Sequence, residues 1–383
     1  MGIFDNLKLN KEQKKMAELA APLVDKKRLN LIKKLLAQKK ISVEKQKMDS
    51  SLFENQEIIQ IKSFTAEVDV SEVNNDLKQK LFESKFKEFK TKAFDEIPKH
   101  IAPNITGMDY VKKAAAIQLF ANQPIHILLL GDPGTGKTDI LRSSANLSPV
   151  SSFGLGSGTS GAGLVVTVKG NEVIKGLLPM ADNGICAIDE LNLMKKEDFA
   201  GMYNAMEKGF VTYDKGGKHY KFDARIKIVA TANPKGDKFE GKTIEKIKDE
   251  IPFDSALLTR FHLVFFIKKP DLEKFKKIAE KILSGDKSKI KDVDAEFIKE
   301  YVKAVDSRIH KVEFSKERQN EVIRFVEELK KKEKEHLVEI SPRFVIGIMR
   351  LCKSLARMEG RDSVQIDDIT RVKEIVLESL KIE

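Results

Sequence analysis

The chain carries Gly131-Asp132-Pro133-Gly134-Thr135-Gly136-Lys137-Thr138 directly after an apolar run at residues 125–130. This sequence fits the pattern G-x-x-x-x-G-K-[ST], in which a buried strand turns through a glycine loop into a helix. The N–H groups of such a loop and the positive end of the helix dipole bind phosphate. We therefore predict a nucleotide site in which Lys137 binds the outer phosphates and Thr138 binds Mg²⁺. The alternative is a chance match in a glycine-rich turn, which the preceding apolar run disfavours.

Length and composition limit the remaining possibilities. The 383 residues are enough for two to three domains. No apolar run approaches the roughly 20 residues of a membrane span and the N-terminus has no apolar signal core, so we expect a soluble, cytoplasmic protein without a membrane partner. The two cysteines, Cys186 and Cys352, form no C-x-x-C pair, which disfavours structural zinc and disulfides. The net charge of +11 fits a polyanionic partner and equally a surface solvated by lysine.

The basic excess is concentrated in residues 1–50, which hold thirteen Lys or Arg against six Asp or Glu. A helix is predicted there by apolar spacing at Leu29, Ile32, Leu35 and Leu36. It either docks on nucleic acid or a partner, or packs on its own protein with its lysines in solvent. Residues 57–72 have the pattern of short strands. A second helix is predicted by the spacing of Leu81, Phe82, Phe86 and Phe89.

Beyond residue 100 the chain alternates apolar runs with helical stretches. Besides the run before the glycine loop, there are apolar runs at residues 185–188, 226–230 and 263–267. Fully apolar runs of this kind indicate a parallel sheet with helices on both faces. The predicted fold class is therefore α/β.

Polar side chains stand where these strands begin or end. Asp189 and Glu190 follow the second run, Thr231 and Asn233 follow the third, and Arg260 precedes the fourth. In an open α/β sheet the ligand binds at the carboxyl ends of the strands. We therefore expect the first four residues to converge on the phosphates and Arg260 to lie at the opposite end.

These residue types suit phosphoryl transfer. Asp189 can hold Mg²⁺, Glu190 can orient the attacking water, and Asn233 can position that water from the other side. An acidic pair after a strand is otherwise a helix N-cap, a reading that the glycine loop upstream disfavours. Arg260 is placed to serve a neighbouring subunit, because an arginine supplied across an interface stabilises the transition state. That predicts a ring.

From Ile101 to Leu380 the chain resembles the ATPase core of the minichromosome maintenance (MCM) family of AAA+ helicases. Seven blocks carry the resemblance, in chain order residues 101–107 with 112–114 and 118–120, 131–134, 157–164, 181–190, 205–208 with 211–215, 230–234 and 257–261. The family's helical lid is resembled by residues 341–344, 355–358, 361–362 and 364. The implied division is a lysine-rich, mostly helical region at 1–99, an AAA+ P-loop ATPase core at 100–270 and a helical lid at 271–383.

The resemblance also implies roles for single residues. Arg343 stands at the sensor 2 position and, like Arg260, would act on the nucleotide of the adjacent subunit in a ring, expected to be a hexamer. Without the resemblance, an arginine after Ser-Pro is the start of a surface helix. The implied site places residues 131–138 around ATP and Thr138 and Asp189 around Mg²⁺. The implied catalytic set is Lys137, Asp189, Glu190, Asn233, Arg260 and Arg343.

Two hairpins are predicted beside the sheet. Residues 164–178 alternate around Lys169-Gly170-Asn171, and residues 210–222 turn at Gly216-Gly217. The resemblance makes them the helix-2 insert and the pre-sensor-1 hairpin, with Lys215 facing a central channel. A lysine there contacts single-stranded DNA phosphates without reading sequence. An exposed turn lysine is the alternative reading.

Some features depart from the family pattern. Residues 1–99 lack the zinc ligands and the length of the N-terminal collar found in replicative members, which argues against processive unwinding. Residues 191–194 read Leu-Asn-Leu-Met where the family tends to have an Asp and a Lys. Neither this change nor Gly136 and Thr138, where Ala and Ser are usual, should abolish ATP hydrolysis.

The favoured function is an ATP-hydrolysing motor on DNA, a helicase or translocase in replication, at the nucleoid and with other replication proteins as further partners. The first alternative is a protein-remodelling ATPase of the MoxR or magnesium-chelatase type. The second is a nucleotide-switched regulatory protein, which the full hydrolysis set disfavours. Stimulation of the ATPase by single-stranded DNA separates motor from remodeller.

Overall fold

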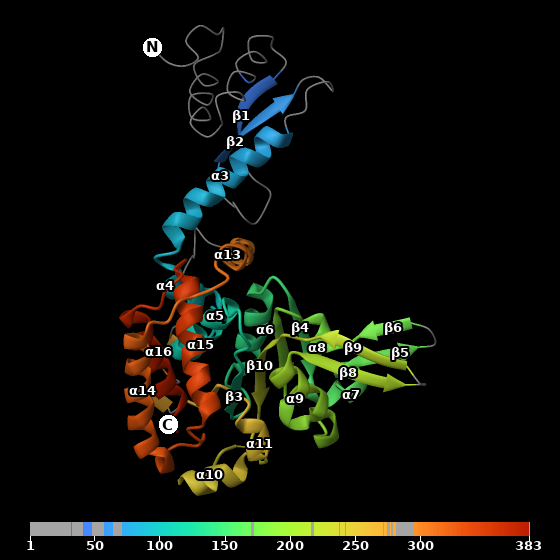
Figure 1. The fold of residues 1–383 in the computed structure, drawn as a ribbon, viewed down its shortest axis with the longest axis vertical. Coiled ribbons are helices and arrows are strands. Elements are labelled where there is room, and N and C mark those ends of the chain that lie inside the picture. The colour runs from blue at the N-terminus through green and yellow to red at the C-terminus, as the bar shows by residue number, and fades with distance from the viewer. Residues whose placement is uncertain are drawn as a thin grey trace. The chain divides into compact units, whose positions relative to one another are not determined.

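The structure of the protein is a computed structural model. It describes residue 32 and residues 41–47, 57–63, 71–169, 172–215, 218–236, 238–241, 243–270, 272, 273, 276, 279, 280 and 294–382. The chain forms two compact units, Met1–Thr91 and Lys92–Glu383 (Figure 1). Within the described ranges, no helix combines the length and the apolar character needed to cross a bilayer.

The first unit contains a hairpin and a long helix. Strand β1, Ile41–Lys47, pairs antiparallel with β2, Glu57–Ser63, and helix α3 spans Ser71–Phe89. β2 confirms part of the predicted strand segment, residues 64–70 lie outside the described residues, and residues 71 and 72 are helical instead. β1 was not predicted, because five of its seven residues are polar or charged and it has no apolar run. Of the helix predicted around Leu29 to Leu36, only Ile32 is described, and the rest lies outside the described residues.

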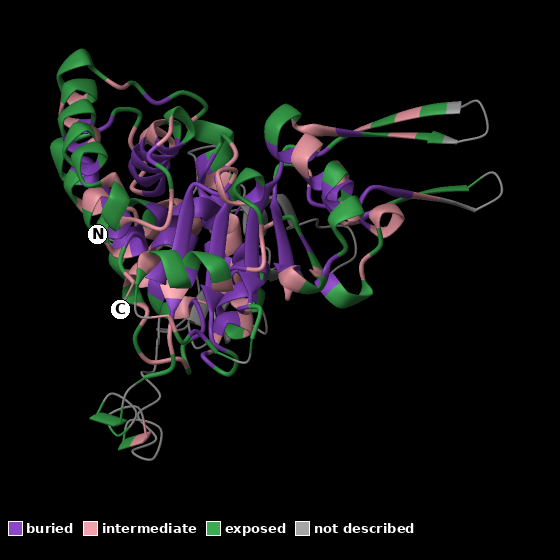
Figure 2. Ribbon diagram, turned by 90° about the horizontal axis from the view of Figure 1, so that it is seen from below, coloured by how far each residue is buried: buried purple, intermediate pink, exposed green. Residues whose placement is uncertain are grey.

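The second unit is built on a five-stranded parallel sheet, as the apolar runs predict. In spatial order the strands are β11 (Leu263–Ile267), β3 (Ile127–Gly131), β10 (Lys227–Ala232), β7 (Ile185–Asp189) and β4 (Ser151–Leu155). β3, β7 and β10 are buried along their whole length, inside a shell of more exposed helices (Figure 2). β4 was not predicted, because this edge strand mixes exposed and buried positions and has no continuous apolar run.

Short helices precede the first strand of the core and connect the strands that follow. They are α4 (Ala93–Glu96), α5 (Asp109–Leu119), α6 (Lys137–Leu147), α7 (Gly161–Leu164), α8 (Leu177–Met180), α9 (Phe199–Lys208), α10 (Ile244–Glu250) and α11 (Ser255–Leu258), with 3₁₀ turns at Ile97–His100, Gly156–Gly158, Leu191–Leu193 and Lys196–Asp198. The side chains of Thr243 and Asp254 cap α10 and α11 by accepting backbone N–H groups. α9 ends at Gly209, whose φ of 72° is the left-handed conformation that favours glycine.

The C-terminal helices form a separate layer against α5. They are α13 (Ala295–Arg308), α14 (Lys316–Lys331), α15 (Pro342–Met358) and α16 (Ile366–Ser379), with a 3₁₀ turn at Glu333–Glu335. Asp294 and Ser315 cap α13 and α14, and Gln365 and Asp368 form a capping box at the start of α16. α15 and α16 both pack on α5, on the side of the sheet away from α7 and α9 (Figure 1).

Two buried cations bind carbonyls at the C-terminal end of α5, and one of them, Arg357, joins the C-terminal layer to the core. Lys227 Nζ donates to the carbonyls of Leu119 (3.1 Å) and Ala121 (3.4 Å), and burial lowers its pKa to about 8. Arg357, from α15, donates to the carbonyl of Phe120 and to Asp306. Because the last carbonyls of a helix lack intrahelical donors, these cations satisfy groups that burial would otherwise leave unpaired.

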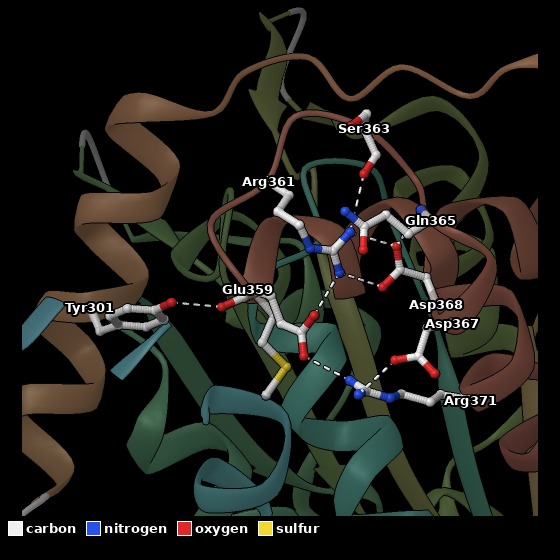
Figure 3. A network of polar contacts seen from close by, with 9 residues as sticks. Tyr301, Glu359, Arg361, Ser363, Gln365, Asp367, Asp368 and Arg371 are labelled. Carbon is white, nitrogen blue, oxygen red and sulfur yellow. Dashed lines mark hydrogen bonds and ion pairs between the residues drawn. The ribbon is translucent and has the colours of Figure 1, made fainter. Parts of the chain in front are cut away.

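A polar network closes the turn between α15 and α16 (Figure 3). Arg361 contacts both Asp368 and Glu359, and Arg371 contacts Glu359 from the next helix. Tyr301 donates its hydroxyl to the carbonyl of Met358 at 2.7 Å. The network fixes the angle between the two helices with groups that are partly or wholly withdrawn from water.

Both predicted hairpins are present. β5 (Val166–Lys169) pairs with β6 (Glu172–Lys175), and β8 (Phe210–Lys215) pairs with β9 (Lys218–Asp223). They project from the same side of the unit, next to α7, α8 and α9 (Figures 1 and 2).

Candidate active site

The glycine loop joins β3 to α6 at the carboxyl edge of the sheet. Gly134 has a φ of 78° and open space where a side chain would start, so a ligand can approach its backbone. Gly136 has a φ of 84°, and a Cβ there would lie 2.9 Å from Ile105 Cδ1. The segment before α5 therefore packs directly on the loop. Lys112 holds that segment by donating to the carbonyls of Ala102 and Ile105.

Lys137 lies buried against its own loop. Its Nζ donates to the carbonyls of Gly131 (2.8 Å) and Asp132 (2.6 Å), and burial lowers its pKa to about 8. The ammonium donates to carbonyl oxygens of the loop, and the nearby carboxylates of Asp132 and Asp189 only partly offset the effect of burial on its pKa. An anion bound in the loop would favour its charged form.

The carboxylate of Asp132 supports the fold of the loop. It is buried, and it accepts the backbone N–H groups of Phe239 (2.9 Å) and Lys269 (3.1 Å). These groups follow β10 and β11, so Asp132 ties the glycine loop to the segments after two other strands. Its backbone is also engaged, because its N–H donates to the carbonyl of Ile267 and its carbonyl accepts from Thr135 and Lys137.

Asp189 lies at the end of β7 beside Thr138. Thr138 Oγ1 donates to Asp189 Oδ1 at 3.2 Å, and Thr231 Oγ1, from β10, donates to the same oxygen. Thr231 in turn accepts the backbone N–H of Glu190 at 3.0 Å. One threonine therefore fixes both acidic residues.

Glu190 and Asn233 complete this edge. Glu190 has a φ of 53°, and the backbone of Gly156 approaches it so closely that a Cβ would lie 2.2 Å from the Glu190 carbonyl oxygen. Asn233 donates its backbone N–H to the side chain of Asn192 at 3.0 Å. Because β10 lies between β3 and β7, the predicted residues Lys137, Asp189, Glu190 and Asn233 share one edge of the sheet.

This edge fits a nucleoside triphosphate with a divalent cation. The first N–H groups of α6 have no acceptor within the helix, and the space above Gly134 is open. Lys137 supplies a cation, and the hydroxyl and carboxylate oxygens of Thr138 and Asp189 are ligands that Mg²⁺ prefers.

The two predicted arginines lie elsewhere. Arg260 precedes β11, at the amino edge of the sheet, as predicted, and Arg343 is in the first turn of α15. Their Nη2 atoms lie 2.9 Å and 2.5 Å from the same atom, Glu207 Oε1 on α9. The Arg260 guanidinium also lies 4.2 Å from the ring centre of Tyr203. We call Tyr203, Glu207, Arg260 and Arg343 the arginine cluster.

Lys215 ends β8, where its backbone is in register with Lys218. Its side chain lies outside the described part of the structure. The predicted contact with DNA therefore stays a prediction.

Comparison with known proteins agrees with this geometry. Residues 82–285 match the model of the MCM P-loop domain, and residues 296–380 match that of the MCM AAA-lid domain. The chain belongs to the MCM family. It carries the AAA+ P-loop core and helical lid of that family, so the resemblance drawn from its motifs is confirmed.

Several curated MCM proteins are similar to it. "Minichromosome maintenance protein MCM" of Saccharolobus solfataricus is 30% identical over 314 residues, 76% of this chain and 45% of the relative. "DNA replication licensing factor MCM4" of Arabidopsis thaliana is 30% identical over 305 residues, 72% of this chain and 36% of the relative. "Probable DNA helicase MCM8" of the same plant is 32% identical over 268 residues, 64% of this chain and 33% of the relative. The chain spans less than half the length of each.

Some residues that shape this MCM site were not assigned a role from the sequence. Thr231 was expected at the strand end, but nothing in the sequence showed that it bridges Asp189 and Glu190. Asn192 stood out only as a departure from the family pattern. Glu207 belonged to a matching block without a role, and only the fold shows that two distant arginines meet on it.

Proposed function

We propose that this MCM-family chain is an ATP-hydrolysing motor that acts on DNA as a ring of subunits. The observation that supports it is the division of the predicted hydrolysis groups between the two edges of one sheet. The carboxyl edge has the groups for phosphates and a metal ion, and the amino edge has two arginines. A complete site then requires the carboxyl edge of one subunit and the arginines of the next.

At the carboxyl edge, we assign Lys137 to the outer phosphates of ATP and the backbone of residues 131–138 to the phosphate chain. Thr138 and Asp189 hold Mg²⁺, which neutralises phosphate charge when bound. Glu190 orients and polarises the attacking water, and Asn233 positions it from the far side. The backbone of Glu190 has a positive φ and is held by Thr231 and by the close approach of Gly156.

At the amino edge, Arg260 and Arg343 stabilise the charge that develops on the phosphates of the neighbour's nucleotide. A strand rises about 3.3 Å per residue, so the five residues of β11 separate Arg260 from its own glycine loop by roughly 16 Å. An arginine side chain does not span that distance. A hexamer is the ring we expect.

The DNA partner is inferred from the hairpins and the charge. The projecting β8–β9 hairpin carries Lys215 at its end, and the net charge of +11 favours a polyanion. Relatives are named as a DNA helicase and as DNA replication licensing factors. We infer single-stranded DNA bound without sequence preference, activity in replication beside other replication proteins, and a place in the cytoplasm at the nucleoid. Residues 100–270 are the motor core and 271–383 the lid, with 1–99 as a separate region.

The test is an ATPase assay of the full chain with and without single-stranded DNA of random sequence, together with strand displacement on a forked duplex. The motor proposal expects turnover to rise with DNA and the DNA effect to decline with salt. Turnover that is indifferent to DNA, with no DNA binding at low salt, would instead support a protein-remodelling ATPase of the MoxR or magnesium-chelatase type.

A further inference from the structure

The arginine cluster holds more positive than negative charge. Arg260 and Arg343 share a single oxygen of Glu207, and no described ion pair gives either of them a second carboxylate. Two guanidinium groups beside one carboxylate form a site with an excess of one positive charge. Such a site binds a more highly charged anion better than it binds Glu207, provided that anion can reach it.

Glu207 occupies the place that a phosphate would take between the two arginines. A carboxylate and a phosphate both offer a guanidinium a pair of anionic acceptor oxygens. The Arg260 side chain is 17% exposed and is held by Tyr203 and the carbonyl of Ala256, whereas that of Arg343 is 47% exposed. The pair is therefore pre-assembled on one side and open to solvent on the other.

The position of Glu207 in the chain links this pair to the β8–β9 hairpin. Glu207 is in the last turn of α9, which ends at Lys208 and is capped by Gly209. β8 begins at Phe210, and the N–H of Ala224, after β9, donates to the carbonyl of Gly209 at 2.8 Å. The base of the hairpin is therefore joined, by the chain and by a hydrogen bond, to the end of the helix that carries Glu207.

We propose that Glu207 is a positioning residue that restrains Arg260 and Arg343 and couples them to the hairpin. Glu207 competes with the phosphates of the neighbour's ATP for the two guanidinium groups. Binding of single-stranded DNA to the hairpin shifts the end of α9, withdraws the carboxylate and leaves the arginines to the phosphates. This inference rests on the proposed function, because it needs a neighbour's nucleotide and a hairpin that binds DNA.

The energy scale permits such an exchange. Ion pairs at exposed positions are weak, so the two contacts of Glu207 together should shift a competing equilibrium only about two- to tenfold. A bound triphosphate can displace contacts of that strength. When no triphosphate is bound, their effect is still large enough to measure.

The first experiment compares the full chain with Glu207→Gln, which keeps the size of the side chain and removes its charge. We expect the KM for ATP to fall about two- to tenfold without DNA, the DNA-free turnover to rise, and most of the DNA stimulation to disappear. The matched control is Glu197→Gln, an exposed glutamate in the 3₁₀ turn before α9, which should behave as wild type. An unchanged KM and undiminished DNA stimulation in Glu207→Gln would overturn the inference.

The outcome separates the inference from the proposed function. If DNA does not raise the ATP turnover of the wild-type chain, the proposed function is contradicted. The KM of Glu207→Gln for ATP, measured without DNA, still tests the competition between Glu207 and phosphate. Wild type with DNA stimulation and a Glu207→Gln variant that matches it contradicts only the role of Glu207.

A second measurement needs no substitution and so does not depend on how a variant folds. Hydrogen exchange of wild type is followed in residues 199–209 with and without a non-hydrolysable ATP analogue. We expect faster exchange in the last turn of α9 when the analogue fills the sites between subunits, because Glu207 then loses both arginines. If hydrogen exchange in that turn slows or stays the same, in protein shown to be assembled, phosphate does not replace Glu207 at the two arginines.

Discussion

The carboxyl and amino edges of the central sheet differ in how firmly they hold their functional groups. At the carboxyl edge, Lys137, Asp189 and Thr231 are buried; Lys137 is hydrogen-bonded to the glycine loop, and Thr231 to Asp189. At the amino edge, Arg343 is half exposed and both arginines depend on one carboxylate. The first edge is fixed by folding alone. The second is arranged so that its groups can change partners, which suits residues that serve another subunit.

The largest effect should come from Arg260, because it tests whether the two edges belong to one site or to two. Arg260→Ala should bind ATP normally and hydrolyse it roughly 10³-fold more slowly or worse, the range known for arginines supplied across an interface. Turnover at saturating ATP and equilibrium ATP binding measure the two effects.

Mixing variants gives the control for that assignment. Arg260→Ala and Lys137→Ala subunits, shown to co-assemble, should regain some turnover at interfaces that join an intact loop to an intact arginine. A mixture that assembles without any recovery would mean that each site is complete within one chain.

The next effect concerns the carboxyl edge alone. Glu190→Gln should retain ATP binding and lose turnover by roughly 10²- to 10³-fold, because the amide cannot polarise the water. Lys137→Ala should instead weaken binding itself. The pair of variants is compared by equilibrium binding and single-turnover hydrolysis, and near-normal turnover in Glu190→Gln would remove this residue from the assignment.

A smaller effect concerns the amino edge, where a buried histidine makes the stability of the fold depend on pH. His126 and His262 lie next to the first residues of β3 and β11, their rings 5.2 Å apart, and the backbone N–H of His126 donates to His262 Nδ1 at 3.0 Å. Burial, together with the cations Arg350 and Arg343, lowers the pKa of His262 from 6.5 to about 3. Between these values the unfolded chain binds more protons than the folded chain, so stability is full above about pH 6.5 and declines as the pH falls.

Urea unfolding at several pH values tests this. We expect the free energy of unfolding to fall by roughly 2–3 kcal/mol between pH 7 and pH 4.5 on account of His262. His262→Asn, which keeps an acceptor for the His126 N–H, should be less stable at pH 7 and show a shallower decline. An equal slope in both proteins would contradict the assignment to His262.

The two edges also differ in how much the sequence reveals. The glycine loop, Asp189 and Asn233 were placed correctly because each follows an apolar strand, and parallel strands bring their carboxyl ends together. β4 was missed because an edge strand needs no apolar run. The order of strands in the sheet could not be predicted from the sequence either, since it depends on packing between distant segments.

The arginine cluster could be predicted only in part. The position of Arg260 before β11 showed that it lies at the opposite edge, but its partner came from a helix some fifty residues earlier in the chain. Glu207 and Tyr203 have ordinary helical spacing, which gives no sign of what they contact. Ion pairs between distant elements follow from tertiary packing, and local sequence does not encode them.

The smallest expected effect concerns Lys215, which belongs to neither edge. If Lys215 contacts DNA phosphates, Lys215→Ala should leave the turnover without DNA and the KM for ATP unchanged, because both edges stay intact. It should weaken binding of single-stranded DNA equally for all sequences, and lower the slope of log affinity against log salt by about one unit, since one phosphate contact no longer releases a counterion. Fluorescence anisotropy over a range of salt concentrations measures the slope, with Lys221→Ala as the control, since that lysine lies over the ring of Phe210 at the base of the same hairpin. A variant that keeps the wild-type slope would leave the β8–β9 hairpin without its predicted DNA contact.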